Sequence, residues 1–408
     1  MAKNFSKRNH YVPQWYQKRF FENKNQTTFN YLDLNPGIII HNEKYSSPRK
    51  ALNQYGTEKS FKQDHLYTIY FGETASDAIE KIFFGKIDKR GEVALPLFSD
   101  FTLSEETKNH FLPFARFLCA QLFRTPKMLN IFSKLSDKNF RLSAMLTARE
   151  LHLHNWASSI WEIVSCENSA TKFIISDAPV TTYNRKVFPA SREVLKVGHA
   201  TIGRVGTRTI FPLSLDKCLI ITPAELIMKP KGDPLRMEDH INYYKDTTFN
   251  LKNIIHGRQI DETEVIAINF ILKTHSKKYI ASTQLDWLYP EKHISFKNWS
   301  NLGGDFFLHP DPRSVNIDEL VRLTSQPAAI QKTINRKKTD YREKNLLNSF
   351  RESINLWESC KAEIREPKAI QPPLNAQAKQ PDYLVRITYE DNLMKVLKEL
   401  KRMPNSPL

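Results

Sequence analysis

With 408 residues the chain can bury a sizeable core, and this length is compatible with two or three domains. A hydrophobic share of 40% and an aromatic share of 11% exclude an intrinsically disordered polymer. The formal net charge of +16 is the most informative value, because a basic excess attracts phosphate polyanions and anionic surfaces. It predicts a nucleic-acid partner, with an ordinary basic surface and charged tail as the alternative.

The four cysteines are far apart and form no CxxC pair, which argues against a zinc knuckle and a dense disulfide framework. The basic N-terminus is not followed by an apolar segment, and no run of the sequence is long enough to span a bilayer. We therefore expect a cytoplasmic protein that does not enter a membrane.

The N-terminal part predicts a short helix and then a β-hairpin. Residues 10–13 (HYVP) are expected to be extended, because the residue before a proline avoids the helical region, and a short helix follows them. Residues 28–34 alternate polar with apolar side chains, residues 35–37 (NPG) turn, and residues 38–41 (IIIH) return, which is typical of a hairpin. Residues 42–65 are polar and predict a surface loop.

Residues 104–164 have a strongly helical pattern. Ser104 is a predicted N-cap followed by two acidic residues, and Thr125-Pro126 predicts a break in the helix. A second helix is expected to continue to Trp161, so this region predicts a helical hairpin or bundle. Residues 261–274 begin with Asp-Glu-Thr-Glu and predict a further helix.

Two apolar, β-rich runs predict strands that are buried on both faces: residues 172–176 (KFIIS) and 218–222 (CLIIT). The first run places Asp177 at the tip of a central strand, a common position for a functional carboxylate. Residues 185–208 lie between the runs and predict a basic, partly flexible loop.

These elements predict an α+β protein in which a small mixed β-sheet packs on a helical bundle, with a helical, basic C-terminal extension. We expect a core domain over residues 1–290, a charged helical extension over residues 291–364, and a linker with a short amphipathic tail helix over residues 365–408.

Four short motifs follow one another along the chain: His10-Tyr-Val-Pro, Gln121-Leu-Phe-Arg-Thr-Pro, Ser176-Asp-Ala-Pro-Val and Phe211-Pro-Leu-Ser. In this order they resemble the motifs of domain-of-unknown-function family 4238, a group of mostly bacterial proteins, over about residues 8–285. The chain departs from the family pattern at Ala178, where a polar residue is expected, and by its long basic extension. The resemblance implies no established reaction, and it mainly supplies a candidate pocket.

Convergence of the motifs would bring an imidazole, two carboxylates, an amide and guanidinium groups together. Carboxylates bind Mg²⁺, arginines bind phosphate oxygens in pairs of hydrogen bonds, and a histidine acts as general acid or base. The predicted catalytic residues are His10, Glu80, Gln121, Arg124 and Asp177, with Glu80 and Asp177 as Mg²⁺ ligands. This set suits hydrolysis of phosphodiester bonds. The alternative is a buried polar network in which Gln121 and Arg124 hold Asp177 in a structural ion pair.

A second group of cations predicts contacts with nucleic acid. Its members are Arg19, Arg185, Lys186, Arg192, Arg204 and Arg208. Most of them alternate with aromatic residues in the loop 185–208, which suits a single-stranded nucleic acid. An ordinary solvated loop is the alternative.

Arg149 and His154 have the RxxxxH spacing of helical HEPN-type ribonuclease toxins. A pair at this spacing is also expected by chance, and the neighbouring tryptophans favour a core face instead. The glycines of the loop lack the Gly-Lys-Ser/Thr of a phosphate-binding P-loop, and neither a GxSxG nor an HExxH motif is present.

We therefore predict a nucleic-acid-directed effector, with metal-dependent nuclease activity in bacterial stress or phage defence as its favoured form. The competing hypothesis is a non-catalytic binding or adaptor protein. In that case the motifs maintain the fold, and the basic surface or the C-terminal tail docks a nucleic acid or a protein.

Overall fold

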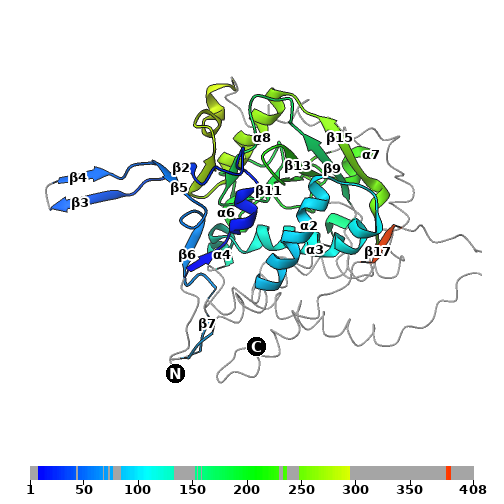
Figure 1. Ribbon diagram of the computed structural model, residues 1–408, viewed down its shortest axis with the longest axis horizontal. Coiled ribbons are helices and arrows are strands. Elements are labelled where there is room, and N and C mark those ends of the chain that lie inside the picture. The colour runs from blue at the N-terminus through cyan, green and yellow to red at the C-terminus, as the bar shows by residue number, and fades with distance from the viewer. Residues whose placement is uncertain are drawn as a thin grey trace, which may run out of the picture.

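A five-stranded mixed sheet forms the centre of the computed structural model (Figure 1). Its strands, in spatial order, are β11 (Thr181–Tyr183), β12 (Arg208–Pro212), β13 (Lys217–Pro223), β9 (Ser159–Ser165) and β15 (Ile254–Gln259). Neighbouring strands are antiparallel except β15 and β9, which are parallel. Every residue of β9 is buried, and so is nearly all of β13, which confirms the prediction that residues 218–222 form a strand buried on both faces.

The structure describes residues 8–42, 45–67, 69–71, 74–76, 84–132, 152–153, 155–157, 159–228, 233–236, 248–294 and 383–386. The predicted helices of the C-terminal extension, together with Arg149 and His154, lie outside these residues.

A second sheet is antiparallel throughout and has four strands. Their order is β10 (Ile175–Ser176), β16 (Tyr279–Ser282), β2 (Phe29–Asp33) and β5 (Leu52–Tyr55). The chain passes from this sheet to the five-stranded sheet between β10 and β11, and it returns from α8 (Glu262–His275) into β16. The two sheets are therefore linked twice within a short distance of Asp177.

Four two-stranded ribbons complete the β-structure of the described residues. They are β1 (Arg8–His10) with β6 (Lys62–Asp64), β3 (Ile38–Asn42) with β4 (Tyr45–Pro48), β7 (Ile69–Phe71) with β8 (Thr74–Ser76), and β14 (Thr248–Asn250) with β17 (Leu384–Arg386). The β3–β4 ribbon projects away from the body of the protein (Figure 1). β17 comes from the C-terminal region and places Val385 in the core, so that this part of the extension belongs to the folded body.

The longer helices pack beside the sheets. They are α2 (Gly85–Ser99), α3 (Glu105–Phe123) and α8, with shorter helices α1 (Gln14–Lys18), α4 (Pro126–Phe132), α6 (Arg192–Val197) and α7 (Ala224–Met228), and 3₁₀ turns η2 (Leu251–Asn253), η3 (Asp286–Leu288) and η4 (Pro290–Lys292). α3 begins at a capping box in which Ser104 and Thr107 satisfy each other's main-chain N–H groups. α2 approaches α3 closely at Gly91, where a Cβ atom would lie 2.6 Å from the Phe117 ring.

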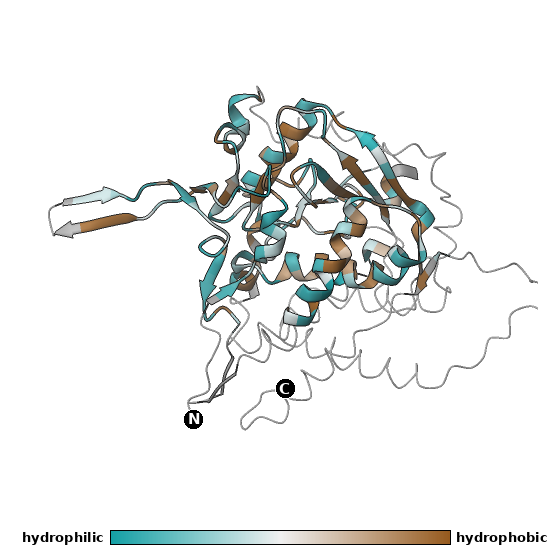
Figure 2. Cartoon of the chain, in the orientation of Figure 1, coloured by the Kyte–Doolittle hydropathy of each residue, from teal (hydrophilic) through white to brown (hydrophobic). Residues whose placement is uncertain are grey.

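Aromatic side chains join the helices to the five-stranded sheet. Phe98 of α2 stacks on Phe114 of α3 with ring centroids 4.3 Å apart, and Phe111 stacks on Phe249 at 4.5 Å. Trp161 of β9 packs against Phe111. Apolar segments of the helices and strands accordingly face one another in the interior (Figure 2), where they form one continuous core.

The predicted fold class is confirmed, because mixed sheets and several helices make an α+β protein. The predicted N-cap at Ser104, the break at Thr125-Pro126 and the helix starting at Asp261 are also confirmed: α3 ends at Phe123, α4 begins at Pro126, and Asp261 caps α8. Each of these predictions rests on local capping chemistry.

The predicted N-terminal hairpin is wrong. β2 pairs with β16 and β5, whereas β3 pairs with β4. Phe29 and Tyr31 bury their side chains in the core through this long-range pairing, which a local pattern does not reveal. The predicted loop over residues 42–65 is wrong for the same reason, since β4, β5 and β6 are short strands with weak polar patterns.

Two further predictions fail in the centre of the chain. Trp161 lies in β9 rather than in a helix, because an apolar run that is buried all round has no period that separates helix from strand. Of the run 172–176, only Ile175–Ser176 is a strand, and it lies at the edge of the four-stranded sheet. Asp177 therefore follows an edge strand and not a central one.

Candidate functional site

Asp177 is buried where the chain crosses between the two sheets. Its Oδ1 accepts a hydrogen bond from the N–H of Lys277 at 2.9 Å. Its Oδ2 accepts from the N–H groups of Lys278 and Tyr279 at 2.7 and 3.0 Å. Burial raises the pKa of Asp177, whereas these three donors and Lys127 act in the opposite direction. The carboxylate thus holds the segment between α8 and β16 in place.

Arg124 is buried at the end of α3 and pairs with α2. Its Nη1 donates to both carboxylate oxygens of Asp88, at 2.8 and 3.0 Å. With the Gln121 amide oxygen turned toward the guanidinium, Nε and Nη2 of Arg124 donate to it, and the Nε contact is 2.8 Å. The ion pair of Arg124 is therefore with Asp88, and not with Asp177 as the network alternative supposed.

His10 and Asp177 come from motifs that lie near each other. Tyr11 packs on Phe61, and Tyr31 contacts both Phe61 and Tyr279. The N–H of Tyr279 binds Asp177, so a chain of aromatic contacts joins the HYVP motif to the SDAPV motif. His10 is half-buried, and its Nε2 is buried without a hydrogen-bond partner in the described part of the chain. Burial lowers the pKa of His10, so its imidazole is neutral at pH 7. Glu80 lies outside the described residues.

Contacts to main-chain oxygens join α1 to the Phe211-Pro-Leu-Ser motif. The Tyr16 hydroxyl donates to the carbonyl oxygen of Pro212 at 2.6 Å. Arg19 donates from Nε to the carbonyl oxygen of Leu213 at 2.9 Å, and burial lowers its pKa. The helix that follows the HYVP motif thus docks onto the end of β12 and the turn after it.

The predicted cations of residues 185–208 differ in their environments. Arg204 forms a two-point ion pair with Glu193, with Nε–Oε1 and Nη2–Oε2 distances of 3.0 and 2.6 Å. Arg208 is buried within β12, and burial lowers its pKa to about 10. The exposed members are Arg185, Lys186 and Arg192. The segment is also more ordered than predicted, since it contains α6, which ends at Gly198 with a φ of 83°.

A small cavity lies between the RTP and SDAPV motifs. Its volume of about 10 Å³ corresponds to about one water molecule. Polar lining residues are Thr125, Lys127, Thr181, Thr182, His199 and His275. Lys127 Nζ donates to the carbonyl oxygen of His275 at 2.6 Å, while Thr182 Oγ1 is buried without a hydrogen-bond partner in the described residues.

Burial lowers the basicity of the side chains around this cavity, so both histidines are neutral at pH 7 whereas Lys127 stays mostly protonated. Burial lowers the pKa of Lys127 to about 8, the pKa of His199 to about 4, and the pKa of His275 well below its ordinary value. His199 Nδ1 lies 2.9 Å from the carbonyl oxygen of Ala200, so Nδ1 carries the proton and Nε2 is an acceptor. The cavity can orient one small polar molecule, but it is too small for a nucleotide.

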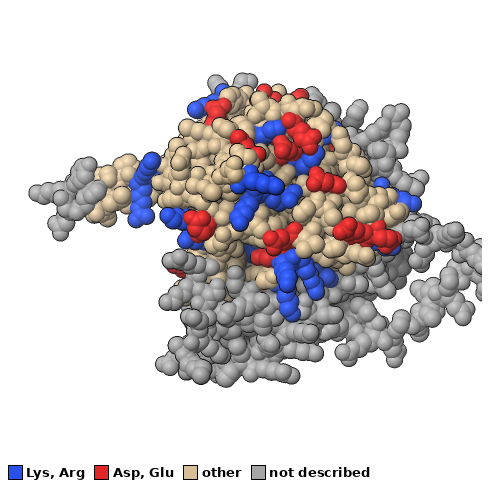
Figure 3. Space-filling view, viewed as in Figure 1, with Lys and Arg blue, Asp and Glu red and all other residues tan. Residues whose placement is uncertain are grey.

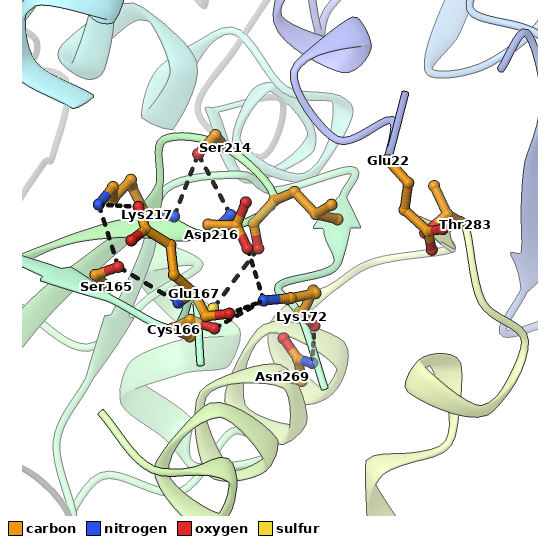
Figure 4. A network of polar contacts seen from close by, with 11 residues as sticks. Glu22, Ser165, Cys166, Glu167, Lys172, Ser214, Asp216, Lys217, Asn269 and Thr283 are labelled. Carbon is orange, nitrogen blue, oxygen red and sulfur yellow. Dashed lines mark hydrogen bonds and ion pairs between the residues drawn. The ribbon is translucent and has the colours of Figure 1, made fainter. Parts of the chain in front are cut away.

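An open groove of about 490 Å³ lies beside the β12–β13 turn. It is lined by Glu22, Glu167, Ala170, Lys172, Leu215, Asp216 and Trp287. Figure 4 shows the polar network along its wall, in which Lys172 Nζ donates to the carbonyl oxygens of Cys166 and Glu167 and pairs with Asp216, all at 2.9 Å.

A motif residue shapes this groove. Ser214 Oγ accepts from the N–H groups of Asp216 and Lys217 at 3.3 and 3.2 Å, which fixes the turn (Figure 4). Lys217 pairs with Glu167 at 2.6 Å and lowers the pKa of that carboxylate. Two of the three lining carboxylates pair with lysines, which leaves Glu22 and the Trp287 ring to favour a small cationic ligand over a phosphate.

Within the described ranges, no three His, Cys, Asp or Glu side chains gather into a metal-binding group. The predicted Mg²⁺ ligands, Glu80 and Asp177, therefore stay a prediction. No helix in the same ranges combines the length and apolar character needed to cross a bilayer.

A family model described as protein of unknown function (DUF4238) matches residues 8–286. The chain belongs to the DUF4238 family. The match starts at β1, spans both sheets and α8, and contains the cavity and all of the groove except Trp287. Comparisons with curated proteins and with solved structures found no match.

Several residues of this DUF4238 site were not singled out from the sequence. Lys127 directly follows the RTP motif, and that position was a signal that could have identified it. His199 and His275 carry no local signal, because they reach the cavity through the packing of α6 on α4 and of α8 on the strands that flank the SDAPV segment. The groove residues come from separate segments and share no motif.

Proposed function

We propose that this DUF4238 protein binds nucleic acid through the phosphate backbone. One face of α2 carries the proposal, because Lys86, Lys89 and Arg90 are exposed there and form no ion pair within the described part of the chain. Residues at i, i+3 and i+4 are neighbours on a helix surface. The three cations therefore concentrate positive charge in a chain whose net charge is already +16.

Stability of the fold does not account for this face of α2. Like charges at helical spacing repel and destabilise the helix by a few tenths of a kcal/mol per pair. Asp88, which lies among them in the sequence, is paired with the buried Arg124. On the face drawn in Figure 3, Lys and Arg side chains form groups near the centre and at the lower edge of the described surface. Arg185, Lys186 and Arg192 supply further exposed cations.

Fluorescence anisotropy with labelled single-stranded RNA, single-stranded DNA and duplex DNA tests the proposal over a series of salt concentrations. We expect the variant Lys86→Gln/Lys89→Gln/Arg90→Gln to raise Kd at least about tenfold and to lower the salt slope by about 2 to 3. The matched control is Lys24→Gln/Lys50→Gln/Lys59→Gln, which removes the same charge from exposed positions elsewhere.

If the two triple variants lost the same affinity for nucleic acid, the attraction would be non-specific, and the proposed role of α2 would be overturned. Absence of binding to every probe at low salt would overturn the proposal as a whole. It would favour the adaptor hypothesis, in which the basic surface or tail docks a protein.

Metal-dependent cleavage of the bound nucleic acid is a second candidate, favoured by the Nε2 of His10, for which the described residues offer no hydrogen-bond partner. A neutral imidazole can act as general base, and Glu80 and Asp177 would hold a Mg²⁺ ion whose charge would stabilise the phosphate. End-labelled RNA and DNA are incubated with the protein in Mg²⁺ or in EDTA. We expect His10→Gln to abolish cleavage with unchanged binding, whereas the partly exposed His110→Gln keeps it. Cleavage that persists in EDTA or in His10→Gln contradicts this candidate.

A further inference from the structure

The β3–β4 ribbon is an apolar arm on an otherwise basic protein. Its strand β3 begins with three consecutive isoleucines, and Ile38, Ile39 and Ile40 are 65%, 41% and 77% exposed. Figure 2 shows β3 as a hydrophobic strand that stands clear of the body. Exposed isoleucines in sequence are unusual, and an isolated two-stranded ribbon is only marginally stable in water.

The two outer edges of the arm differ. The N–H of Arg49 donates to the carbonyl oxygen of Gly37 at 2.8 Å, so these two residues are a hydrogen-bonded pair. In an antiparallel ladder, hydrogen-bonded and non-hydrogen-bonded pairs alternate, and Ile39 is therefore the next residue of β3 whose main chain bonds to β4. The main-chain groups of Ile38 and Ile40 then face outward from β3. On the other edge Pro48, paired with Ile38, has no N–H to offer. Prolines and charged side chains commonly prevent an edge strand from pairing with another chain, and β3 contains neither.

We propose that the outer edge of β3 pairs with β3 of a second copy of this chain and forms a four-stranded, twofold-symmetric sheet. The twofold axis passes through Ile39, so Ile39 faces its counterpart and Ile38 faces Ile40 of the other copy. Ile38 and Ile40 then exchange the outward main-chain hydrogen bonds, and Ile39 occupies the close, non-hydrogen-bonded position. This inference is independent of nucleic-acid binding.

The register selects a second copy as the occupant, and the charge indicates where two copies meet. Only a strand with the same three isoleucines matches each of them with an isoleucine, and an antiparallel twofold supplies that match. The irregularity between Ile40 and Asn42 confines regular pairing to Ile38–Ile40, whose centre is Ile39. Two chains of charge +16 repel, so they meet most favourably through a projecting strand without charged residues.

Sedimentation and light scattering over a range of concentrations test the dimer. We expect a concentration-dependent dimer for the unchanged chain, and at least about a tenfold weaker association for Ile39→Lys, which sets two like charges against each other on the axis. The matched control is the exposed Val93→Lys on α2. A chain that stays monomeric at the highest attainable concentration, or a dimer that Ile39→Lys leaves unchanged, overturns the proposal. Dimerisation that requires added nucleic acid also overturns it.

Cross-linking tests the register. In a Cys360→Ser background the other cysteines, Cys119, Cys166 and Cys218, are buried. Ile39→Cys is expected to form an intermolecular disulfide under mild oxidation, because its counterpart lies directly opposite. Ile38→Cys alone is expected to react poorly, whereas mixing Ile38→Cys with Ile40→Cys restores the cross-link. The reverse pattern would show a different register and refute the twofold at Ile39.

Discussion

Asp177 and Tyr279 exchange two hydrogen bonds that join the SDAPV motif to β16. The N–H of Asp177 donates to the carbonyl oxygen of Tyr279 at 2.9 Å, and the N–H of Tyr279 donates to Asp177 Oδ2 at 3.0 Å. The first bond needs no particular side chain, but the second requires a carboxylate or amide oxygen. This position in the motif therefore has a structural task that is separate from any catalytic one.

Replacement of Asp177 is expected to lower the free energy of unfolding. Asp177→Ala leaves three partly buried N–H groups without their acceptor, at a cost of roughly 1–3 kcal/mol for each group that finds no water. Asp177→Asn keeps one oxygen and is expected to lose less. Urea unfolding followed by circular dichroism measures both. If the two variants were as stable as the unchanged chain, the carboxylate would have no such structural task.

Removing only one partner of the ion pair between Arg124 and Asp88 is expected to lower the free energy of unfolding strongly. Arg124→Met leaves Asp88 without its partner, and Asp88→Leu leaves a buried guanidinium, so each single change should cost roughly 3–5 kcal/mol. The double variant removes both charges and is expected to recover much of that loss. Chemical unfolding of all four proteins closes the cycle, and strictly additive losses would contradict the coupling.

Gly91 is expected to resist substitution even by alanine. In a helix, glycine to alanine normally stabilises by up to about 1 kcal/mol. At Gly91 the new Cβ would lie 2.6 Å from the Phe117 ring, so we expect a loss of about 1–3 kcal/mol instead. Gly37→Ala is the control, since nothing lies within 4 Å of its Cβ position. Thermal unfolding distinguishes the two, and a stabilised Gly91→Ala protein would disprove the close contact.

Acidification is expected to destabilise the protein through His199. Burial lowers its pKa to about 4 in the fold, while the unfolded chain takes up the proton near pH 6.5. Between these values the unfolded state binds more protons, so stability falls as the pH is lowered from about 6.5 to 4, by up to about 3 kcal/mol. We expect His199→Gln to flatten the dependence of Tm on pH over this window. The partly exposed His110→Gln is the matched control and should leave the slope unchanged.

Local chemistry made part of the fold predictable. Ser104 and Asp261 predict the starts of their helices because their side chains cap the first turn. The β13 run is apolar enough to predict a strand buried on both faces. The order of the motifs was also sufficient to indicate the family. These features depend on neighbours in the sequence, which is why they could be read without coordinates.

The candidate site was less accessible to sequence reasoning, because its geometry is set by long-range pairing. Asp177 and Arg124 were predicted to act together, but Asp177 accepts a hydrogen bond from Tyr279 whereas Arg124 forms an ion pair with Asp88. Sequence spacing does not predict either partner. The same limit applies to β2, whose partner strands are remote. Lys127 is the exception, since it adjoins a motif.

The pairing of β14 with β17 has a practical consequence for work with shortened proteins. Phe249 of β14 is nearly inaccessible to solvent, and it packs on Phe111 in the core. Removal of Leu384–Arg386 would take away the strand bonded to Phe249 and its neighbours. A protein truncated before Leu384 would thus expose part of its hydrophobic core to solvent. Loss of activity after truncation could then result from a destabilised fold as readily as from a missing tail.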